Sequence, residues 1–68
     1  SISFLPEFRG QGLGQQLMTA MLNLLKAKGY PGISLSVSKE NPAVGFYQRL
    51  GFVTVDERED DYLMLCRL

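Results

Sequence analysis

Apolar residues recur with a helical period between Leu13 and Lys28. One row of them falls at positions 13, 17, 20 and 24 and a second at 14, 18, 21 and 25, so together they form one broad face. Gly29 supplies a left-handed cap, and Pro31 prevents continuation of the helix. The pattern predicts an amphipathic helix over residues 13–28 with a broad buried face. Its opposite, polar stripe consists of Gln15, Gln16, Thr19, Asn23 and Lys26.

Between Gly32 and Ser38, apolar and polar residues alternate strictly instead of following the helical period. Isoleucine, leucine and valine fall on one side and three serines on the other, which is the period of a strand. Upstream of the helix, residues 1–5 are typical of the end of a strand that stops at Pro6. The first half of the chain is therefore predicted to run strand, helix, strand.

A second, short helix is predicted to begin at Asn41 and Pro42. Asn is a favoured N-cap, and Pro suits the first helical position because its missing N–H would have no partner there. Gly51 closes the helix. Its apolar face, spaced i, i+3, i+4 and i+7, consists of Ala43, Phe46, Tyr47 and Leu50.

The last part of the chain predicts a β-hairpin. Residues 52–55 and 62–68 have strand character, and the run from Asp56 to Asp61 between them carries five acids and one arginine. We interpret that run as a solvated turn at the tip of an antiparallel hairpin. Residues 62–68 are apolar on both faces, which predicts a central strand.

The element order β-α-β-α-β-β predicts an α/β fold with a mixed sheet, built from a right-handed crossover followed by the hairpin. Its 68 residues form one domain near the lower limit of independent stability, since so short a chain buries only about 60% of its unfolded surface. One cysteine and no histidine exclude an intrachain disulfide, a zinc finger and Ser-His or Cys-His catalysis, and no metal site is predicted. We expect Cys66 to be an inert core residue.

Seven basic residues balance seven acidic ones, so no overall field would recruit nucleic acid or a charged membrane. No apolar run approaches the roughly 20 residues that cross a bilayer. These features predict a soluble, cytoplasmic protein with neither nucleic acid nor membrane as a partner. No signal peptide or initiator Met is visible, so we expect the chain to begin after processing or at an artificial boundary.

A glycine-rich loop lies directly between the first strand and the first helix. The three alternating glycines of residues 9–14, Arg-Gly-Gln-Gly-Leu-Gly, remove Cβ atoms that would keep a ligand away from the backbone. The helix start adds unpaired N–H groups at the positive end of its dipole, which suits a phosphate or pyrophosphate. Neither the dinucleotide fingerprint nor the P-loop pattern is present. The glycines alone would also serve a tight strand-to-helix turn.

Two segments resemble motifs of the GNAT superfamily of N-acetyltransferases. Residues 4–14 are similar to its acetyl-CoA-binding motif, Gln/Arg-x-x-Gly-x-Gly/Ala, whose core Arg9, Gly12 and Gly14 match. Residues 41–52 resemble its second motif, in which Asn and Tyr precede a Gly-Phe pair. The resemblance covers essentially the whole chain but only the C-terminal, cofactor-binding half of the family's fold. It therefore implies a single partial domain over residues 1–68, from a truncated protein.

The resemblance also implies roles for individual residues. The backbone around Phe4 and Leu5 would pair with pantetheine and polarise the thioester carbonyl, and Asn41 would reach the cofactor arm. Tyr47 is at the position of the family's general acid and would protonate the departing CoA thiolate, which suits a phenol that is protonated at neutral pH. Backbone amides of the glycine loop would hold the CoA pyrophosphate: Arg9, Gly10, Gln11, Gly12, Leu13, Gly14 and, next to them, Gln15.

Each of these roles has a structural alternative. Tyr47 lies on an apolar helix face, where a core aromatic with a hydrogen-bonded hydroxyl is the simpler reading. Asn41 is explained by N-capping alone. Arg9 is alternatively a solvated loop residue.

We expect an N-acetyltransferase fragment that uses acetyl-CoA to acetylate a primary amine of a small molecule or a protein by direct transfer. The family's acceptor site, and often its general base, lie in N-terminal elements that nothing here matches, so much of the first helix's apolar face should stay uncovered. One alternative is a non-catalytic half-domain that pairs with another chain or with its own copy, as a homodimer or domain swap. The other is a module for a different phosphate ligand.

Overall fold

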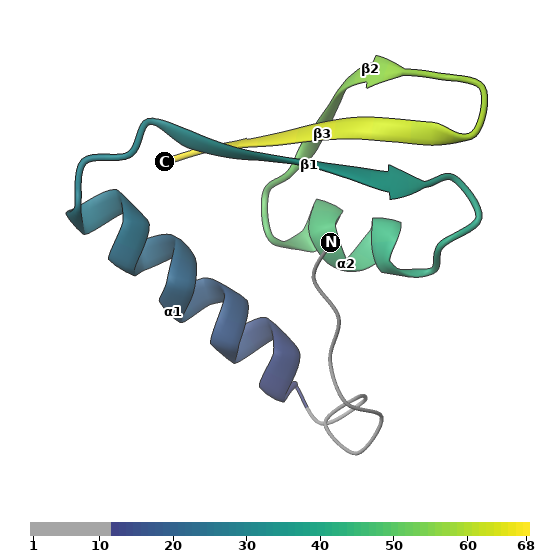
Figure 1. Ribbon diagram of the computed structural model, residues 1–68. Helices are drawn as coiled ribbons and strands as arrows, with labels where there is room; N and C mark the ends of the chain where they lie inside the picture. Colours follow the sequence, from purple (N-terminus) through teal and green to yellow (C-terminus); the bar gives the residue numbers. More distant parts are fainter. Residues whose placement is uncertain (1–11) are drawn as a thin grey trace.

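Two helices and three strands make up the described part of the structure, a computed structural model whose residues 12–68 are described below. The predicted strand at residues 1–5 and the loop residues up to Gln11 lie outside the described residues. In chain order the elements are α1 (Leu13–Ala27), β1 (Gly32–Ser38), α2 (Ala43–Arg49), β2 (Val53–Glu57) and β3 (Asp61–Arg67) (Figure 1).

The three strands form one sheet in the order β1-β3-β2, which confirms the prediction that the last strand is central. β1 pairs with β3 from Gly32 opposite Arg67 to Ser38 opposite Asp61, and β2 pairs with the other edge of β3. Both pairings are antiparallel. The parallel pairing that the predicted mixed sheet requires would involve residues 1–5, outside the described residues. Both helices lie on the same face of the sheet (Figure 1).

Both helices end in a Schellman motif, in which two backbone N–H groups beyond the helix bond back to its last carbonyls. In α1 the N–H groups of Gly29 and Tyr30 donate to the carbonyls of Lys26 and Leu25, at 3.0 and 3.1 Å. α1 therefore ends at Ala27, one residue before the predicted end, and Gly29 caps it as expected.

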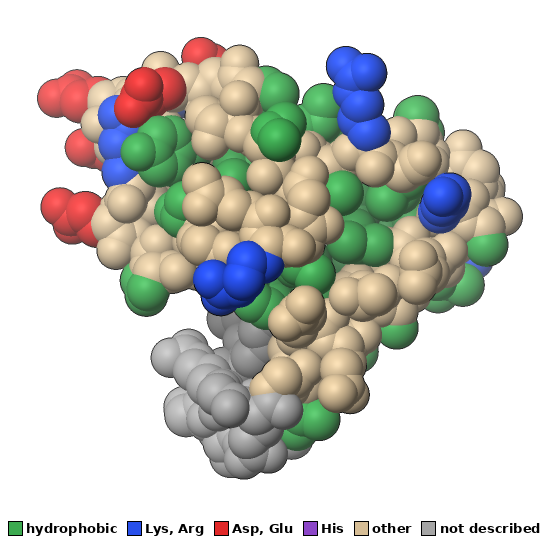
Figure 2. All heavy atoms as spheres, turned by 180° about the vertical axis from the view of Figure 1, so that it is seen from behind, with side chains coloured by type: hydrophobic (Ala, Val, Ile, Leu, Met, Phe, Trp, Pro, Cys, Tyr) green, Lys and Arg blue, Asp and Glu red, His purple; other side chains and the backbone are tan. Residues whose placement is uncertain are grey.

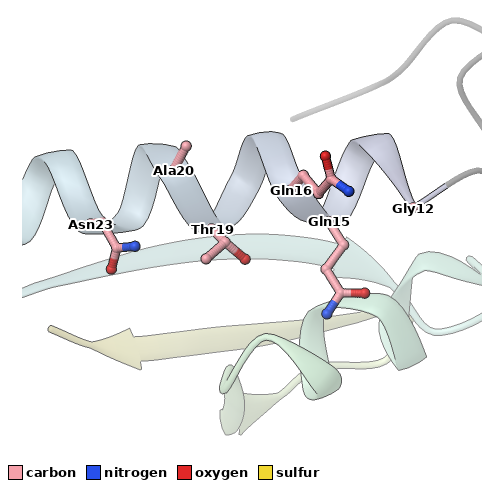
Figure 3. A pocket seen from close by; sticks show the side chains of 6 residues that line it. All are labelled: Gly12, Gln15, Gln16, Thr19, Ala20 and Asn23. Carbon is pink, nitrogen blue, oxygen red and sulfur yellow. The ribbon is translucent and has the colours of Figure 1, made fainter.

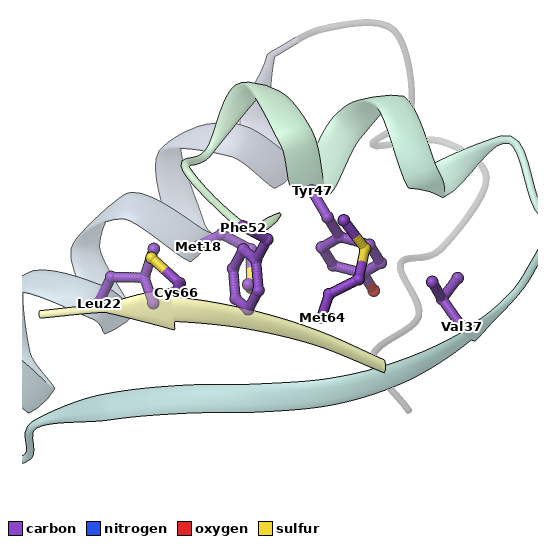
Figure 4. Packing of buried hydrophobic residues seen from close by; sticks show 7 residues of the cluster. All are labelled: Met18, Leu22, Val37, Tyr47, Phe52, Met64 and Cys66. Atoms are coloured by element: carbon purple, nitrogen blue, oxygen red, sulfur yellow. The ribbon is translucent and has the colours of Figure 1, made fainter. Parts of the chain in front are cut away.

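The core lies between the helices and β3 (Figure 4). Along α1, the row that contains Met18 faces it together with Leu22, which belongs to neither predicted row, whereas Leu17 and Leu24 are 61% and 55% exposed. The broad buried face predicted for α1 is therefore wrong for one of its two rows, and the expectation that much of its apolar face stays uncovered is confirmed. The buried residues are Met18, Leu22, Val37, Tyr47, Phe52, Met64 and Cys66.

The acidic run lies at the hairpin tip as predicted, but half of its six residues belong to strands and not to the turn. Asp56 and Glu57 belong to β2, and β3 already begins at Asp61. Charged side chains are tolerated there because β2 is an edge strand whose five residues are all exposed. Figure 2 shows the acidic side chains gathered at this end of the molecule. Lys39 ties the tip to the end of β1, with its Nζ 3.0 Å from Glu57 Oε1.

Candidate functional site

Gly12 shapes the N-terminus of α1. It holds the N-cap position with φ +73° and offers no side-chain cap. Its carbonyl accepts the first intrahelical hydrogen bond, from the N–H of Gln16 at 3.1 Å, so the N–H groups of residues 13–15 precede that ladder. Among residues 12–68, a Cβ built on Gly12 would meet no atom within 4 Å. In this part of the chain, nothing therefore occupies the space beside Gly12 at the helix start, where an anion would approach.

A shallow depression of about 540 Å³ runs from this helix start along the exposed side of α1. In Figure 3, Gln15 and Thr19 point to one side of the helix, and Gln16 and Ala20 to the other. None of the residues 12–68 that line it is charged, so within this part of the chain hydrogen bonds from amides and a hydroxyl would hold a ligand there. The lining residues are Gly12, Gln15, Gln16, Thr19, Ala20 and Asn23.

The structure brings together only some of the residues predicted for the pyrophosphate. Gly12 and Gln15 line the depression, whereas Leu13 and Gly14 belong to the same first turn without lining it. The predicted ligands Phe4, Leu5, Arg9, Gly10 and Gln11 lie outside the described residues. Three further lining residues, Gln16, Thr19 and Asn23, belong to the polar stripe of the amphipathic helix, and their spacing in the sequence is the signal for a shared surface.

Asn41 sits one residue farther from α2 than predicted. Pro42, not Asn41, holds the N-cap position, so the predicted N-cap is wrong by one residue. The amide oxygen Oδ1 of Asn41 nevertheless accepts the N–H of Ala43 at 2.9 Å, and its carbonyl accepts the N–H of Val44 at 3.1 Å. The side-chain oxygen thus has a capping role, and the exposed amide NH₂ is left for solvent or a ligand.

Tyr47 lies in the core, as its structural alternative predicted, with only 5% of its surface exposed. Its ring packs edge-to-face on Phe46 and Phe52, with centroids 5.5 and 5.6 Å apart. No hydrogen bond to its hydroxyl is found among residues 12–68, so the hydrogen-bonded version of that alternative is wrong there. No fully buried side-chain oxygen in this region lacks a partner. The hydroxyl oxygen is therefore not sealed from solvent.

Residues 12–68 contain neither a metal-binding cluster nor a membrane-spanning helix. No cluster of three or more His, Cys, Asp or Glu side chains that could hold a metal ion occurs there. Neither described helix is long and apolar enough to cross a membrane. The buried thiol of Cys66 lies 4.0 Å from the Leu50 carbonyl, in the environment expected of an inert core cysteine.

Comparisons with known proteins agree on one family. Residues 1–54 match the model of the acetyltransferase (GNAT) domain. An acetyltransferase of Pectobacterium atrosepticum is 42% identical over 52 residues, which are 75% of this chain and 37% of that protein. The [ribosomal protein bS18]-alanine N-acetyltransferase of Haemophilus influenzae is 36% identical over 62 residues, or 91% of this chain and 42% of that protein.

A solved structure shows the same fold. The PaiA N-acetyltransferase of Thermoplasma acidophilum, solved in complex with coenzyme A, superposes with a TM-score of 0.83 and 26% sequence identity. The superposition covers 93% of this chain and 40% of that one. The chain thus spans about two fifths of the length of the proteins that it matches. With a matching domain model over most of its length, this chain belongs to the GNAT family of acetyltransferases.

Proposed function

We propose that this chain is the acetyl-CoA-binding part of an N-acetyltransferase domain that acetylates a primary amine. The observation that carries the proposal is Gly12, which turns the chain with φ +73° into α1 and has no atom of residues 12–68 within 4 Å of where its Cβ would stand. A phosphate group is stabilised in such a place by these N–H groups and by the helix dipole. The neighbouring structure was solved with coenzyme A, whose pyrophosphate is a ligand of this kind.

The cofactor site we propose extends from residues outside the described range into the depression on α1. Gly12, Leu13, Gly14 and Gln15 would hold the pyrophosphate through the backbone, together with Arg9, Gly10 and Gln11. Phe4 and Leu5 would contact pantetheine, and the free NH₂ of Asn41 would donate to the cofactor. Acetyl-CoA supplies the acyl group and a thiolate leaving group.

Tyr47 is the proton donor in this proposal. As the amine nitrogen bonds to the acyl carbon and the carbon–sulfur bond breaks, the Tyr47 hydroxyl gives its proton to the departing sulfur. Solvent then reprotonates the phenolate, and the amine's own proton is lost to a base that we do not assign to this chain. The supporting observation is that the hydroxyl has no hydrogen-bond partner among residues 12–68 and is not sealed from solvent.

The test compares two substitutions at Gly12. Gly12→Ala adds a Cβ that meets open space, so its effect is backbone strain alone. Gly12→Glu adds the same strain plus a carboxylate that repels the pyrophosphate. By calorimetry we expect the glutamate variant to lose at least about tenfold in acetyl-CoA affinity, roughly 1.4 kcal/mol, relative to the alanine variant. Equal affinities in two folded variants would remove the pyrophosphate from this position.

A further inference from the structure

The turn that follows α2 brings the ring of Phe52 into contact with the ring of Tyr47, which Phe46 also contacts. The N–H of Gly51 donates to the Gln48 carbonyl at 3.1 Å, and the N–H of Phe52 donates to the Tyr47 carbonyl at 3.0 Å. These two bonds are the Schellman motif, in which the residue after the left-handed glycine commonly packs on the last helical turn. Gly51 permits the turn with φ +103°. Phe52 is therefore bound to the backbone of the same residue whose ring it touches.

The ring contact reinforces this backbone bond. The Tyr47 and Phe52 rings are 5.6 Å apart at 63°, within the favourable range for edge-to-face aromatic pairs. Phe52 is 2% exposed and packs in the same cluster as Met64, which is fully buried. Since protein interiors are close-packed, Phe52 cannot swing away without opening the core. Tyr47 is thus held by Phe52 both at its backbone carbonyl and at its ring.

We propose that Phe52 is a positioning residue for Tyr47, and the proposal rests on the proton-donor role given to Tyr47 above. A general acid must lie within hydrogen-bond reach of the atom it protonates, about 2.6–3.2 Å. The hydroxyl is at the far end of the ring, so a small rotation of the side chain about its Cα–Cβ bond moves the hydroxyl by a large fraction of that distance. Phe46 also contacts the ring, but it is a neighbour on the same helix, whereas Phe52 reaches the ring from outside the helix.

A double-mutant cycle tests the proposal in acetyl transfer to an amine, followed by the release of free CoA. We expect Phe52→Leu to lower kcat about tenfold, since misplacement of a catalytic group by 1 Å costs up to about a hundredfold. The KM for acetyl-CoA should stay nearly constant. In a Tyr47→Phe background the same substitution should have almost no further effect on kcat, because the hydroxyl that it misplaces is already absent.

The matched control is Leu22→Ala, which truncates another residue of the buried cluster. Leu22 is 8% exposed and lies at the far end of that cluster from Tyr47 (Figure 4). This variant should lose stability and keep kcat when every variant is assayed folded. An equal fall of kcat for Phe52→Leu in both backgrounds would overturn the positioning role. An unchanged kcat in Tyr47→Phe would instead refute the proton-donor role.

A second measurement needs no turnover. In the chain labelled with ¹³C-tyrosine, ring flipping of Tyr47 measured by NMR should be severalfold faster in Phe52→Leu and unchanged in Leu22→Ala. Tyr30, 55% exposed, provides a freely flipping reference in the same sample. Equal acceleration by both substitutions would overturn the proposal. An absence of turnover in the unsubstituted chain would refute its catalytic function and leave ring flipping to decide whether Phe52 restrains the Tyr47 ring.

Discussion

A single side chain near α2 has a structural role in the fold and a binding role in the function that we propose. The amide of Asn41 has two ends, and only its oxygen is used by the fold, as acceptor of the Ala43 N–H at 2.9 Å. The NH₂ end is a donor that the cofactor would use under the proposed function. The two roles therefore fall on different atoms of the same group.

Asn41→Asp separates these roles, because aspartate keeps the acceptor and loses the donor. We expect Asn41→Ala to cost about 1 kcal/mol of stability through the lost cap, and Asn41→Asp to cost only a few tenths. Acetyl-CoA affinity should fall in the aspartate variant despite its retained stability, since a carboxylate cannot donate to the cofactor. Urea unfolding and calorimetry measure the two effects. Unchanged affinity in Asn41→Asp would assign this residue to capping alone.

The end of α2 depends on one backbone conformation. Gly51 has φ +103°, which an L side chain rarely adopts, whereas Gly45 lies inside the helix. Among residues 12–68, a Cβ on Gly45 would meet only the flexible end of Arg49, at 3.4 Å, and a Cβ on Gly51 would be 3.8 Å from Cys66 Sγ. Space is therefore not the obstacle at either position. The difference between them is conformational.

We accordingly expect opposite signs for the same substitution at these two glycines. Gly51→Ala should destabilise the fold by about 1–2 kcal/mol, the cost of a left-handed conformation for a residue with a Cβ. Gly45→Ala should stabilise it by up to about 1 kcal/mol, because alanine favours a helix interior. Thermal unfolding of the two variants supplies the comparison. A loss at Gly45 as large as that at Gly51 would contradict the assignment of α2.

The two apolar rows of α1 differ in burial, and two adjacent residues, one from each row, show the difference. Leu17 is 61% exposed and Met18 only 2%. Leu17→Ala should therefore change stability by no more than about 0.5 kcal/mol. Met18→Ala should cost about 2–5 kcal/mol, because it leaves a cavity in the core. The urea midpoints of the two variants measure both changes in stability. Similar losses of stability in the two variants would contradict the orientation of α1, in which Met18 and not Leu17 faces the core.

Sequence patterns were sufficient for the elements whose signals are local. The helical period of residues 13–28, the alternation of residues 32–38 and the glycines at 29 and 51 each act within a few residues, so their structures follow directly. Which row of α1 is buried depends instead on where the sheet lies. The strand ends in the acidic run depend on backbone pairing at an exposed edge, where charge is no obstacle.

The candidate site was predictable to a similar degree. The glycine pattern pointed to Gly12, and the structure adds its left-handed φ and the lack of any atom of residues 12–68 beside it, which a periodicity cannot reveal. The burial of Tyr47 followed from its apolar helix face, yet the Phe52 contact required knowledge of the turn after α2. Gln16 and Thr19 appeared only as polar residues, because a shared depression is a property of a folded surface.

At the scale of the whole molecule, the small size of the domain makes its Tm sensitive to any bound ligand. Seven buried residues hold the described part together, and its only cysteine is a free thiol. A ligand that binds only the folded state at 100 times its Kd adds about 2.7 kcal/mol. For a domain of this size, each kcal/mol raises Tm by roughly 4–8 °C.

We therefore expect acetyl-CoA at that concentration to raise Tm by about 10–20 °C. ATP at equal concentration shares the adenine and phosphates but lacks pantetheine, so it should give a clearly smaller shift. Gly12→Glu should abolish most of the acetyl-CoA shift, which separates site binding from a general solvent effect. A larger shift with ATP would favour a module for another phosphate ligand. Absence of any shift would favour a half-domain that pairs with another chain, whose complex light scattering would then detect.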